Sequence, residues 1–438
     1  MLANDLKLTQ NSYYAVSANE QPAYPTLQSD IEADVCVVGG GFAGLSSAIE
    51  LADRGYKVTV LEANHIGFGA SARNGGQLIA GLACEQSVIE NALGLEASKQ
   101  VWNMSIEALD LVRQRVKRFD IKCDLTDGYI GVAVNPKKAA SLRKWLDEMA
   151  KKYDYKTQTV SSTNVKLWVN SPRYHSGYFD KLGGHIHPLN YCLGLAKGAA
   201  SLGVQVFQHS AVTAMQQGNT VTLQTAKGQV KAKFVVLAGN MYLPEISPKV
   251  APSIANRIMP VGTYIIGTEP IDPALAKQLI PNNAAVCDTN FVLDYFRFSG
   301  GNNAKAPRML YGGRVSYSAM TPPNLTQSMS ARMVETFPQL KDTKVEYTWG
   351  GFVDITMSRA PDFGRIAPNI YYLQGFSGHG VNTTGLAGKV VAEAINGQAT
   401  NFDVFSKIKH HDFFGGKLMR TPALVLGMAW YQLREKFG

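Results

Sequence analysis

The sequence DVCVVGGGFAGLSSAIELADRGYKVTVLE, residues Asp34–Glu62, decides the fold. It opens with the β-branched apolar run Val35–Val38, which is typical of a strand buried on both faces. Gly39, Gly41 and Gly44 follow in the G-x-G-x-x-G arrangement. In this arrangement the first glycine turns the chain, the second lets backbone approach a pyrophosphate, and the third lets helix pack on strand.

The rest of this stretch completes a dinucleotide-binding βαβ unit. Apolar residues continue at helical spacing and stop at Gly55, where glycine can adopt a left-handed cap. The second strand, Lys57–Leu61, ends in Glu62. An acid at this point accepts hydrogen bonds from a ribose 2′-hydroxyl. The order of these parts therefore predicts that the chain binds a dinucleotide.

Composition limits the possible classes of protein. The chain has 438 residues, of which 45% are hydrophobic and 18% charged, as in an ordinary globular protein of two or three domains. Its net charge of +9 is spread along the chain and forms no aromatic-interleaved basic patch, so we expect no nucleic-acid partner. No stretch approaches the roughly 20 apolar residues of a membrane span. The five scattered cysteines favour reduced thiols in a cytoplasmic protein.

The elements expected after Glu62 alternate in type. We expect helices over 96–118, Ala139–Lys152, Leu189–Leu202, Asp272–Ile280, Gln327–Thr336 and Thr384–Ile395. We expect strands over Tyr129–Val134, Val204–Gln208, Thr220–Thr225, Val230–Leu237, Val261–Thr268, Phe291–Phe298, Arg308–Val315, Lys344–Phe352 and Ile370–Leu373.

Three further motifs favour FAD over a nicotinamide cofactor. The first, GFGASARNGGQ (Gly67–Gln77), follows Glu62 directly and allows close backbone approach. The second, VVLAGN (Val235–Asn240), ends a buried strand in small residues. The third, GFSGHG (Gly375–Gly380), opens a helix, whose free N–H groups and positive dipole end suit the pyrimidine edge of a flavin.

The predicted fold class is α/β (α+β overall). A discontinuous, Rossmann-like FAD-binding domain carries an inserted, mainly antiparallel β-sheet substrate domain. We assign residues 1–30 to an N-terminal arm, 31–95, 181–245 and 353–400 to the FAD-binding domain, 96–180 and 246–352 to the substrate-binding domain, and 401–438 to a C-terminal tail.

The chain resembles the glycine/D-amino-acid oxidase superfamily of FAD-dependent amine oxidoreductases. The likeness runs from SYYA at Ser12–Ala15 to the tail at Leu433. Its most specific pieces are IGFGASARNGGQ (Ile66–Gln77), GGHIHPLN (Gly183–Asn190), TAKGQV (Thr225–Val230), LAGN (Leu237–Asn240), LDYFR (Leu293–Arg297) and QGFSGHGV (Gln374–Val381). Within the superfamily, they are most similar to those of bacterial enzymes that act on gamma-glutamylputrescine.

The resemblance implies oxidation of a C–H bond next to an amine, with hydride passing to the flavin. The imine then hydrolyses to aldehyde and ammonia, and O2 is reduced to H2O2. Gamma-glutamylputrescine is the expected substrate and gamma-glutamyl-gamma-aminobutyraldehyde the expected product. The alternatives are a dehydrogenase or oxidase of another amine, such as a D-amino acid, sarcosine or a pipecolate-like imino acid, that uses a quinone or carrier, and a non-catalytic flavin-binding subunit. A tRNA-modifying flavoenzyme is a more distant alternative.

FAD is expected to be bound without a covalent tether. Some relatives carry a tethering cysteine before the last strand, but Trp349–Arg365 contains none. The expected cofactor-binding residues are Gly39, Gly41, Phe42, Ala43, Gly44, Glu62, Ala63, Ser71, Arg73, Asn74, Gly75, Gly76, Gln77, Val212, Ala238, Gly239, Gly378, His379, Gly380, Val381 and Thr383.

Aromatic residues are the candidates for the substrate pocket. An alkylammonium must lose a proton before it can give up hydride, and an apolar aromatic wall lowers its pKa and holds it by cation–π contact. Tyr264, Tyr295 and Phe296 lie on strands of the expected substrate domain. Packing in the core is the alternative for each.

Arginine and histidine residues complete the candidate catalytic set of Arg73, Tyr295, His379 and Arg359. Arg359 can bind a substrate carboxylate in a bidentate way, and an ion pair with Asp362 is the alternative. His379 is expected beside the flavin, and Arg73 against its ring.

Other polar residues receive no catalytic role. His185, His187 and the pair His410–His411 lack the further ligands that a metal needs, so no metal site is expected. Lys305 lies in a polar loop, and Arg297 and Arg314 are expected at the surface, so no oxygen-activating residue is assigned.

The C-terminal tail carries an apolar-then-basic helical pattern over 421–437. Packing on its own domain is expected, with a place on a membrane surface as the alternative. The oligomeric state is left open.

Overall fold

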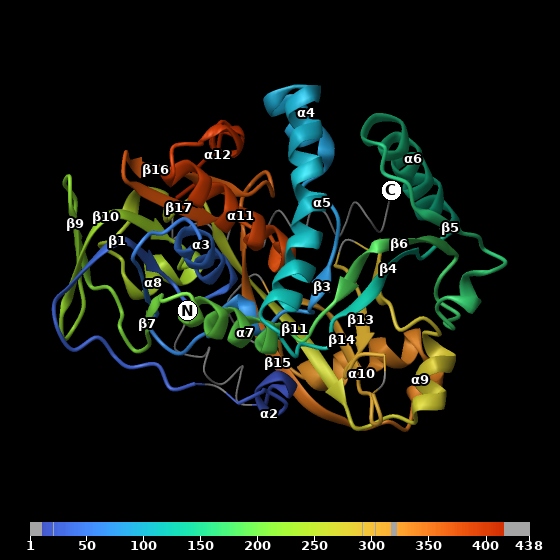
Figure 1. Cartoon of the computed structure of the whole chain (residues 1–438). Helices are drawn as coiled ribbons and strands as arrows, with labels where there is room; N and C mark the ends of the chain where they lie inside the picture. The colour runs from blue at the N-terminus through green and yellow to red at the C-terminus, as the bar shows by residue number, and fades with distance from the viewer. Residues whose placement is uncertain (1–10, 21, 291, 303, 317–321, 416–438) are drawn as a thin grey trace.

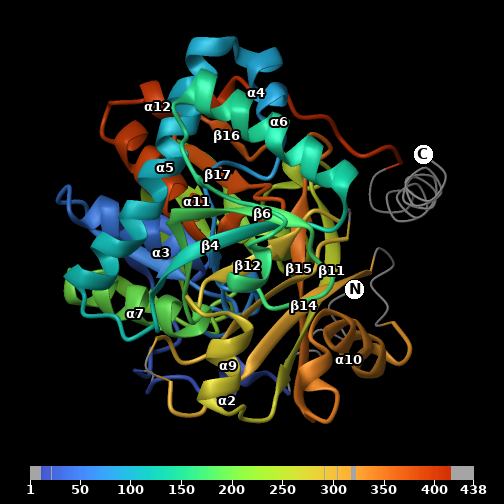
Figure 2. The same ribbon diagram turned by 90° about the vertical axis from the view of Figure 1, so that its right-hand side faces the viewer.

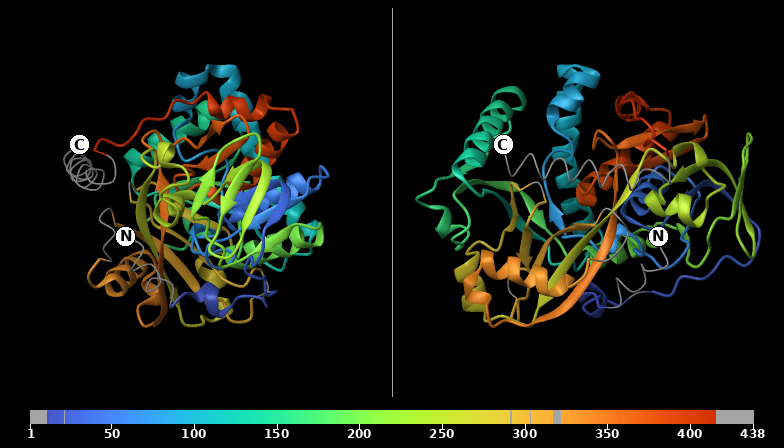
Figure 3. Two further views of the ribbon diagram at one scale, coloured as in Figure 1. Left: turned by 90° about the vertical axis from the view of Figure 1, so that its left-hand side faces the viewer. Right: turned by 180° about the vertical axis from the view of Figure 1, so that it is seen from behind.

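The computed structural model describes residues 11–20, 22–290, 292–302, 304–316 and 322–415. Within them the strands form two sheets that lie on the left and the right of Figure 1, with helices packed around both. Figure 2 and Figure 3 show the same arrangement from the sides and from behind, with the long helix α6 (Pro136–Tyr153) standing above the second sheet. The helix expected at 421–437 lies outside the described residues.

The first sheet is built around β1 (Ile31–Val38), which pairs in parallel with β2 (Val58–Leu61) and β10 (Gln229–Leu237). Its apolar residues are buried on both faces, as the β-branched sequence predicts. The strand order is β16-β17-β10-β1-β2-β7, with β9 pairing to β10 and β8 to β9. The other strands are β7 (Gln205–Phe207), β8 (Ala214–Gln216), β9 (Val221–Gln224), β16 (Asp362–Ala367) and β17 (Ile370–Gln374).

Helices cover one face of this sheet. The helix after the glycine turn, α3 (Phe42–Ala52), packs on α11 (Gly380–Ile395), since a Cβ at Gly388 would lie 2.6 Å from the backbone of Ser46. Gly44 is equally confined, because its added Cβ would overlap the carbonyl of Gly39. The same layer includes α4 (Gln86–Leu93), α5 (Leu95–Arg118), α7 (Pro188–Ser201) and α12 (Thr400–Ser406), and α8 (Leu243–Ile246) lies on the opposite face.

The second sheet has the order β15-β11-β14-β13-β12-β4-β6-β3, and all its pairs are antiparallel except β12 with β4. One face packs against α9 (Pro273–Leu279) and α10 (Leu325–Thr336). The other face meets α6 (Pro136–Tyr153) and the N-terminal helix α2 (Tyr13–Val16). The strands are β3 (Gln77–Leu78), β4 (Thr126–Ala133), β5 (Gln158–Val160), β6 (Ser176–His185), β11 (Met259–Thr268), β12 (Ala285–Asp288), β13 (Tyr295–Phe298), β14 (Met309–Ser316) and β15 (Val345–Ile355).

The two-sheet α/β architecture expected from the sequence is confirmed. Every strand of the first sheet lies within the ranges 31–95, 181–245 and 353–400, although the domain boundaries themselves stay a prediction. The strand expected at 291–298 is shorter: β13 covers only Tyr295–Phe298, and residues 292–294 lie outside the strand, where Asp294 N donates to Asp288 Oδ1 at 3.1 Å. All five cysteines are free thiols. No helix in the described part of the chain is long and apolar enough to cross a membrane.

Candidate cofactor pocket and active site

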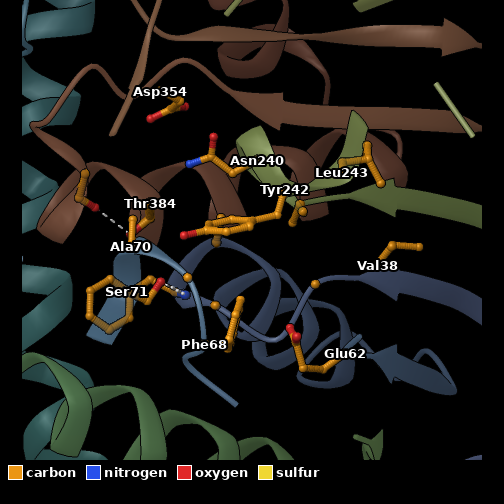
Figure 4. A pocket seen from close by; sticks show the side chains of 18 of the residues that line it. Val38, Glu62, Phe68, Ala70, Ser71, Asn240, Tyr242, Leu243, Asp354 and Thr384 are labelled. Carbon is orange, nitrogen blue, oxygen red and sulfur yellow. Dashed lines mark hydrogen bonds between the residues drawn. The ribbon is translucent and has the colours of Figure 1, made fainter. Parts of the chain in front are cut away.

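A pocket of about 1110 Å³, which includes solvent space at its mouth, opens where β1, β2 and β10 end. Figure 4 shows side chains from several segments of the chain pointing into it. Of the residues expected to bind the cofactor, those that line it are Gly39, Gly41, Phe42, Ala43, Glu62, Ala63, Ser71, Asn74, Val212, Ala238, Gly239, Gly378, Gly380 and Val381.

The glycine turn presents backbone to this pocket. Gly39 has a φ of +115°, a conformation that favours glycine, and Gly41 is the extended N-cap of α3. An added Cβ at Gly41 would lie 2.8 Å from Ser71 Oγ, which accepts a hydrogen bond from Phe42 N at 2.9 Å. The N-terminus of α3 is therefore a narrow cradle that suits a phosphate group.

Glu62 directly follows β2 and lies beside the glycine turn. Its Oε2 accepts from Gly40 N at 2.7 Å and its Oε1 from Asn64 N at 2.8 Å. Burial raises the pKa of this carboxyl, while the hydrogen bonds from Asn64 and Gly40 lower it. The carboxylate is thus fixed against the pocket wall, where the sequence predicts a ribose contact.

The N-terminus of α11 reaches the pocket through the loop Gly375–Gly380. Asp354, at the end of β15, accepts hydrogen bonds from the backbone N–H of Gly375 and, at 3.0 Å, of Phe376. Its carboxyl is 3% exposed, and burial raises its pKa to about 6. Asp354 therefore ties the glycine-rich loop to the second sheet.

Sequence reasoning missed several residues that line the pocket. Asp354 was detectable in principle, because an acid inside the apolar strand GGFVDI is unusual. Phe68 and Asn240 lie within two of the motifs that favour FAD, whereas Tyr242 carried no such signal; the Tyr242 and Phe68 rings meet edge to face at 5.7 Å. Figure 4 shows Asn240 beside Asp354, and Tyr242 next to Ala70; an added Cβ at Gly69 would lie 3.1 Å from the Tyr242 ring.

The segment Arg73–Gly76 lies beside the pocket rather than along its lining, except for Asn74. Arg73 is buried, with its guanidinium 4.7 Å from the centre of the Phe68 ring. Gln77 donates from Nε2 to Val286 O at 2.9 Å and so links β3 to β12 within the second sheet. Contacts of Arg73, Gly75, Gly76 and Gln77 with the cofactor stay predictions.

The three candidate aromatic residues separate onto two faces of the second sheet. Tyr295 packs against Gly75, whose added Cβ would lie 2.9 Å from the ring. Phe296 instead stacks on Tyr311 at 5.5 Å in the core under α10, and Tyr264 belongs to the same core. The expected substrate role is therefore wrong for Phe296 and Tyr264, because strand alternation directs them away from the pocket.

His379 is the N-cap of α11, and its Nε2 lies 3.1 Å from the carbonyl oxygen of Ile79. Burial lowers the pKa of this imidazole, which favours its neutral form. Thr383 Oγ1 donates to the carbonyl of His379 at 2.5 Å. Neither side chain lines the pocket, so their cofactor contacts stay predictions.

Arg359 is exposed and has a φ of +62° in the turn after β15. The alternative of an ion pair with Asp362 is wrong. Asp362 is buried and accepts from Tyr372 Oη at 3.0 Å and Gln374 Nε2 at 2.9 Å, with Arg257 at 3.8 Å.

The expected surface position of Arg297 is also wrong, because its side chain is only 2% exposed. Arg314 is half-buried and donates to Ser328 Oγ at 2.6 Å.

The histidines named in the sequence make structural hydrogen bonds: His187 caps α7 by accepting from Asn190 N, and His185 Nε2 lies 2.8 Å from Asn283 O. The described residues contain no group of three or more His, Cys, Asp or Glu side chains placed to hold a metal.

Comparison with known proteins identifies the family. The model of FAD dependent oxidoreductases (DAO) matches residues 34–394, which is most of the chain. The chain belongs to this FAD-dependent oxidoreductase family. The predicted enzyme class and cofactor are thereby confirmed.

This oxidoreductase is similar to two bacterial proteins over nearly its whole length. Gamma-glutamylputrescine oxidoreductase of Escherichia coli (strain K12) is 43% identical over 428 residues, covering 98% of this chain and 99% of the relative. Probable oxidoreductase OrdL of Haemophilus influenzae is 40% identical over 430 residues, covering 97% of each. The crystal structure of glycine oxidase from Geobacillus kaustophilus shares the fold, with a TM-score of 0.71 at 19% identity, covering 84% of this chain and 96% of that one.

The residues of the pocket fit FAD. The confined backbone at Gly41 suits a pyrophosphate, and Glu62 stands where a ribose hydroxyl would meet it. The start of α11 supplies a second helix N-terminus, suited to the negative charge of a reduced flavin. None of the described residues that line the pocket is a cysteine.

Proposed function

We propose that this oxidoreductase oxidises the primary amine of gamma-glutamylputrescine. One amine, one O2 and one water give gamma-glutamyl-gamma-aminobutyraldehyde, ammonia and H2O2. The observation that carries this proposal is 43% identity over 98% of the chain to a gamma-glutamylputrescine oxidoreductase. We also propose that the enzyme acts in the cytoplasm.

FAD would be held non-covalently between the two helix N-termini. When bound, FAD accepts two electrons from the C–H bond next to the amine and passes them to O2. Gly41 and Ser71 at α3 would hold the pyrophosphate, Glu62 the ribose, and Gly380 and Val381 at α11 the flavin end.

The face of the second sheet that carries Tyr295 would form the substrate wall. Tyr295 packs with Cys287 and Ile79, and Trp145 of α6 contacts Tyr178 from above. Such a surface is largely apolar and excludes water, so it lowers the pKa of a bound alkylammonium and favours the neutral amine. The tyrosine and tryptophan faces also hold the cationic form as it arrives.

Arg359 would bind the carboxylate of the glutamyl group. It is exposed next to the loop that begins α11, and it forms no ion pair within the described part of the chain. A guanidinium suits a carboxylate because its N–H groups donate in a planar fork. Putrescine itself lacks this carboxylate, so Arg359 would select the glutamylated amine.

Turnover of a substrate panel by the purified holoenzyme tests the proposal. The panel contains gamma-glutamylputrescine, putrescine, glycine, sarcosine, L-proline and a D-amino acid, and both aldehyde and H2O2 are measured. We expect the highest kcat/KM for gamma-glutamylputrescine, with aldehyde and H2O2 formed in equal amounts. Turnover only with an artificial electron acceptor would instead support a dehydrogenase. Preference for another amine would overturn the substrate assignment.

A further inference from the structure

The N-terminal helix α2 lies under the junction of the two sheets, beside α7 and β15 (Figure 1). Tyr14 on this helix is fully buried, and its ring meets Trp349 edge to face at 5.1 Å. Its hydroxyl accepts a hydrogen bond from Arg297 Nη2 at 3.1 Å. Tyr14 therefore contacts two side chains that come from distant strands, β15 and β13.

Arg297 is a buried cation, and all of its hydrogen-bond acceptors among the residues that the structure describes are uncharged. Nε donates to Gly75 O at 2.7 Å, Nη2 to Ile186 O at 2.8 Å and Nη1 to Phe298 O at 3.2 Å. Burial of a guanidinium costs free energy unless its donors are satisfied. The planar guanidinium of Arg297 therefore binds backbone carbonyls, and its shortest hydrogen bond is to the carbonyl of Gly75.

Trp349 holds a second carbonyl of the same segment. Its indole Nε1 donates to Arg73 O at 3.2 Å, and the ring is buried against Tyr14. The two partners of Tyr14 therefore fix the carbonyls of Arg73 and Gly75, on either side of Asn74, which lines the FAD pocket.

The segment Arg73–Gly76 needs such support because glycine gives it little stiffness of its own. Gly76 has a φ of +75°, and an added Cβ there would overlap the carbonyl of Ile186. The ring of Tyr295 lies against Gly75. A shift of this segment would therefore move both a lining residue of the pocket and the aromatic wall proposed for the substrate.

We propose that Tyr14 is a positioning residue for the active site. It acts through Arg297 and Trp349 to fix the segment Arg73–Gly76 against the bound flavin. The N-terminal arm is then part of the catalytic architecture, although it lies outside both sheets. The predicted change in the flavin environment requires only that the chain binds FAD, the cofactor of its family. The predicted change in turnover also rests on the proposed function, because it requires the amine substrate.

The substitution Tyr14→Phe tests this role in the holoenzyme, because it removes only the hydroxyl that binds Arg297. The neighbouring Tyr13→Phe is the matched control, since the Tyr13 ring packs on Tyr347 at 5.7 Å rather than on Arg297. For Tyr14→Phe we expect FAD to remain stoichiometric, the visible circular dichroism of the flavin to change, and kcat to fall about 10-fold with KM within about twofold. Tyr13→Phe should leave all three unchanged.

A lower melting temperature with unchanged flavin dichroism and unchanged kcat would overturn the proposal, because it would show support of the fold alone. Trp349→Phe is the second variant, which keeps the ring but removes the donor to Arg73 O. We expect Trp349→Phe to alter the flavin dichroism in the same way as Tyr14→Phe. If Tyr14→Phe does not fold, unchanged flavin dichroism in Trp349→Phe would overturn the proposal. The dichroism needs no substrate, so it stays informative even if the amine is misassigned.

Discussion

Tyr295 and Phe296 are neighbours in the chain, but their side chains lie on opposite faces of the second sheet. The Tyr295 ring packs against Gly75, beside the cofactor pocket, whereas the Phe296 ring stacks on Tyr311 beneath α10. The alternation of β13 therefore separates the residue proposed for the substrate wall from a residue of the core.

The two positions should respond differently to truncation. Tyr295→Ala should lower kcat/KM about 10-fold through loss of the aromatic wall, with FAD affinity nearly unchanged. Phe296→Ala should lower the free energy of unfolding by about 3–5 kcal/mol and leave kcat/KM of the folded enzyme unchanged. Steady-state kinetics and denaturant unfolding measure both. The reverse pattern would show that the sheet faces are misassigned.

Gly41→Val should abolish stoichiometric FAD binding. The new side chain would meet Ser71 and fill the space where backbone approaches the pyrophosphate. We expect the Kd for FAD to rise at least about 100-fold, or about 2.7 kcal/mol. The control is Gly55→Ala, a left-handed position with open space around it, which should cost about 1 kcal/mol of stability and no FAD affinity. If Gly41→Val is purified with one FAD per chain, the pyrophosphate lies elsewhere.

Glu62→Ala should weaken FAD binding without unfolding the protein. Loss of a charged hydrogen-bond acceptor at the ribose should raise the Kd by about 10- to 100-fold. Titration of apoprotein with FAD, followed by flavin fluorescence, gives this value. The exposed Glu32 on β1 provides a control, Glu32→Ala, for which the Kd should stay the same. Equal affinities for the two variants would argue against the ribose contact.

Asp354 should make stability depend on pH. Burial raises its pKa from 3.8 to about 6 in the folded protein, so the native state binds this proton more tightly than the unfolded chain. Its contribution to stability is complete below about pH 4 and is lost as pH rises through about 6. The unfolding free energy of apoprotein, relative to Asp354→Asn, should therefore fall by about 2 kcal/mol between pH 4 and 7.

The control for this pH dependence is Asp110→Asn, an exposed position on α5. The unfolding free energies of wild type and of Asp110→Asn are measured over the same pH range as a reference. A difference between wild type and Asp354→Asn that stays constant from pH 4 to 7 would contradict the raised pKa of Asp354.

Arg359→Met should affect only substrates with a carboxylate. We expect KM for gamma-glutamylputrescine to rise about 10-fold, through loss of a charge-assisted hydrogen bond, and KM for putrescine to stay unchanged. Arg143→Met, exposed on α6, is the control. Equal changes in KM for both amines would contradict carboxylate binding by Arg359.

The cofactor unit was predictable from sequence because its determinants are local. The glycine spacing, the apolar strands and Glu62 lie within a continuous stretch, and each residue type has a direct backbone or hydrogen-bonding reason. The loop GFSGHG was predictable for the same reason, as glycines directly ahead of an apolar helix.

The missed features depend on contacts between distant segments. Alternation shows that Tyr295 and Phe296 face opposite ways, but only the packing of α10 decides which one is in the core. The sequence predicts a surface position for Arg297, yet its acceptors Gly75 and Ile186 lie 222 and 111 positions away in the chain. Asp354 likewise binds a loop that follows it by more than 20 residues.

Anaerobic mixing of the purified yellow holoenzyme with gamma-glutamylputrescine tests the central claim most directly. We predict one FAD per chain and complete loss of the oxidised-flavin absorbance band within the turnover time, with the band restored when O2 is admitted. A colourless protein that takes up no added FAD, or a bound flavin that gamma-glutamylputrescine does not bleach, would contradict the account.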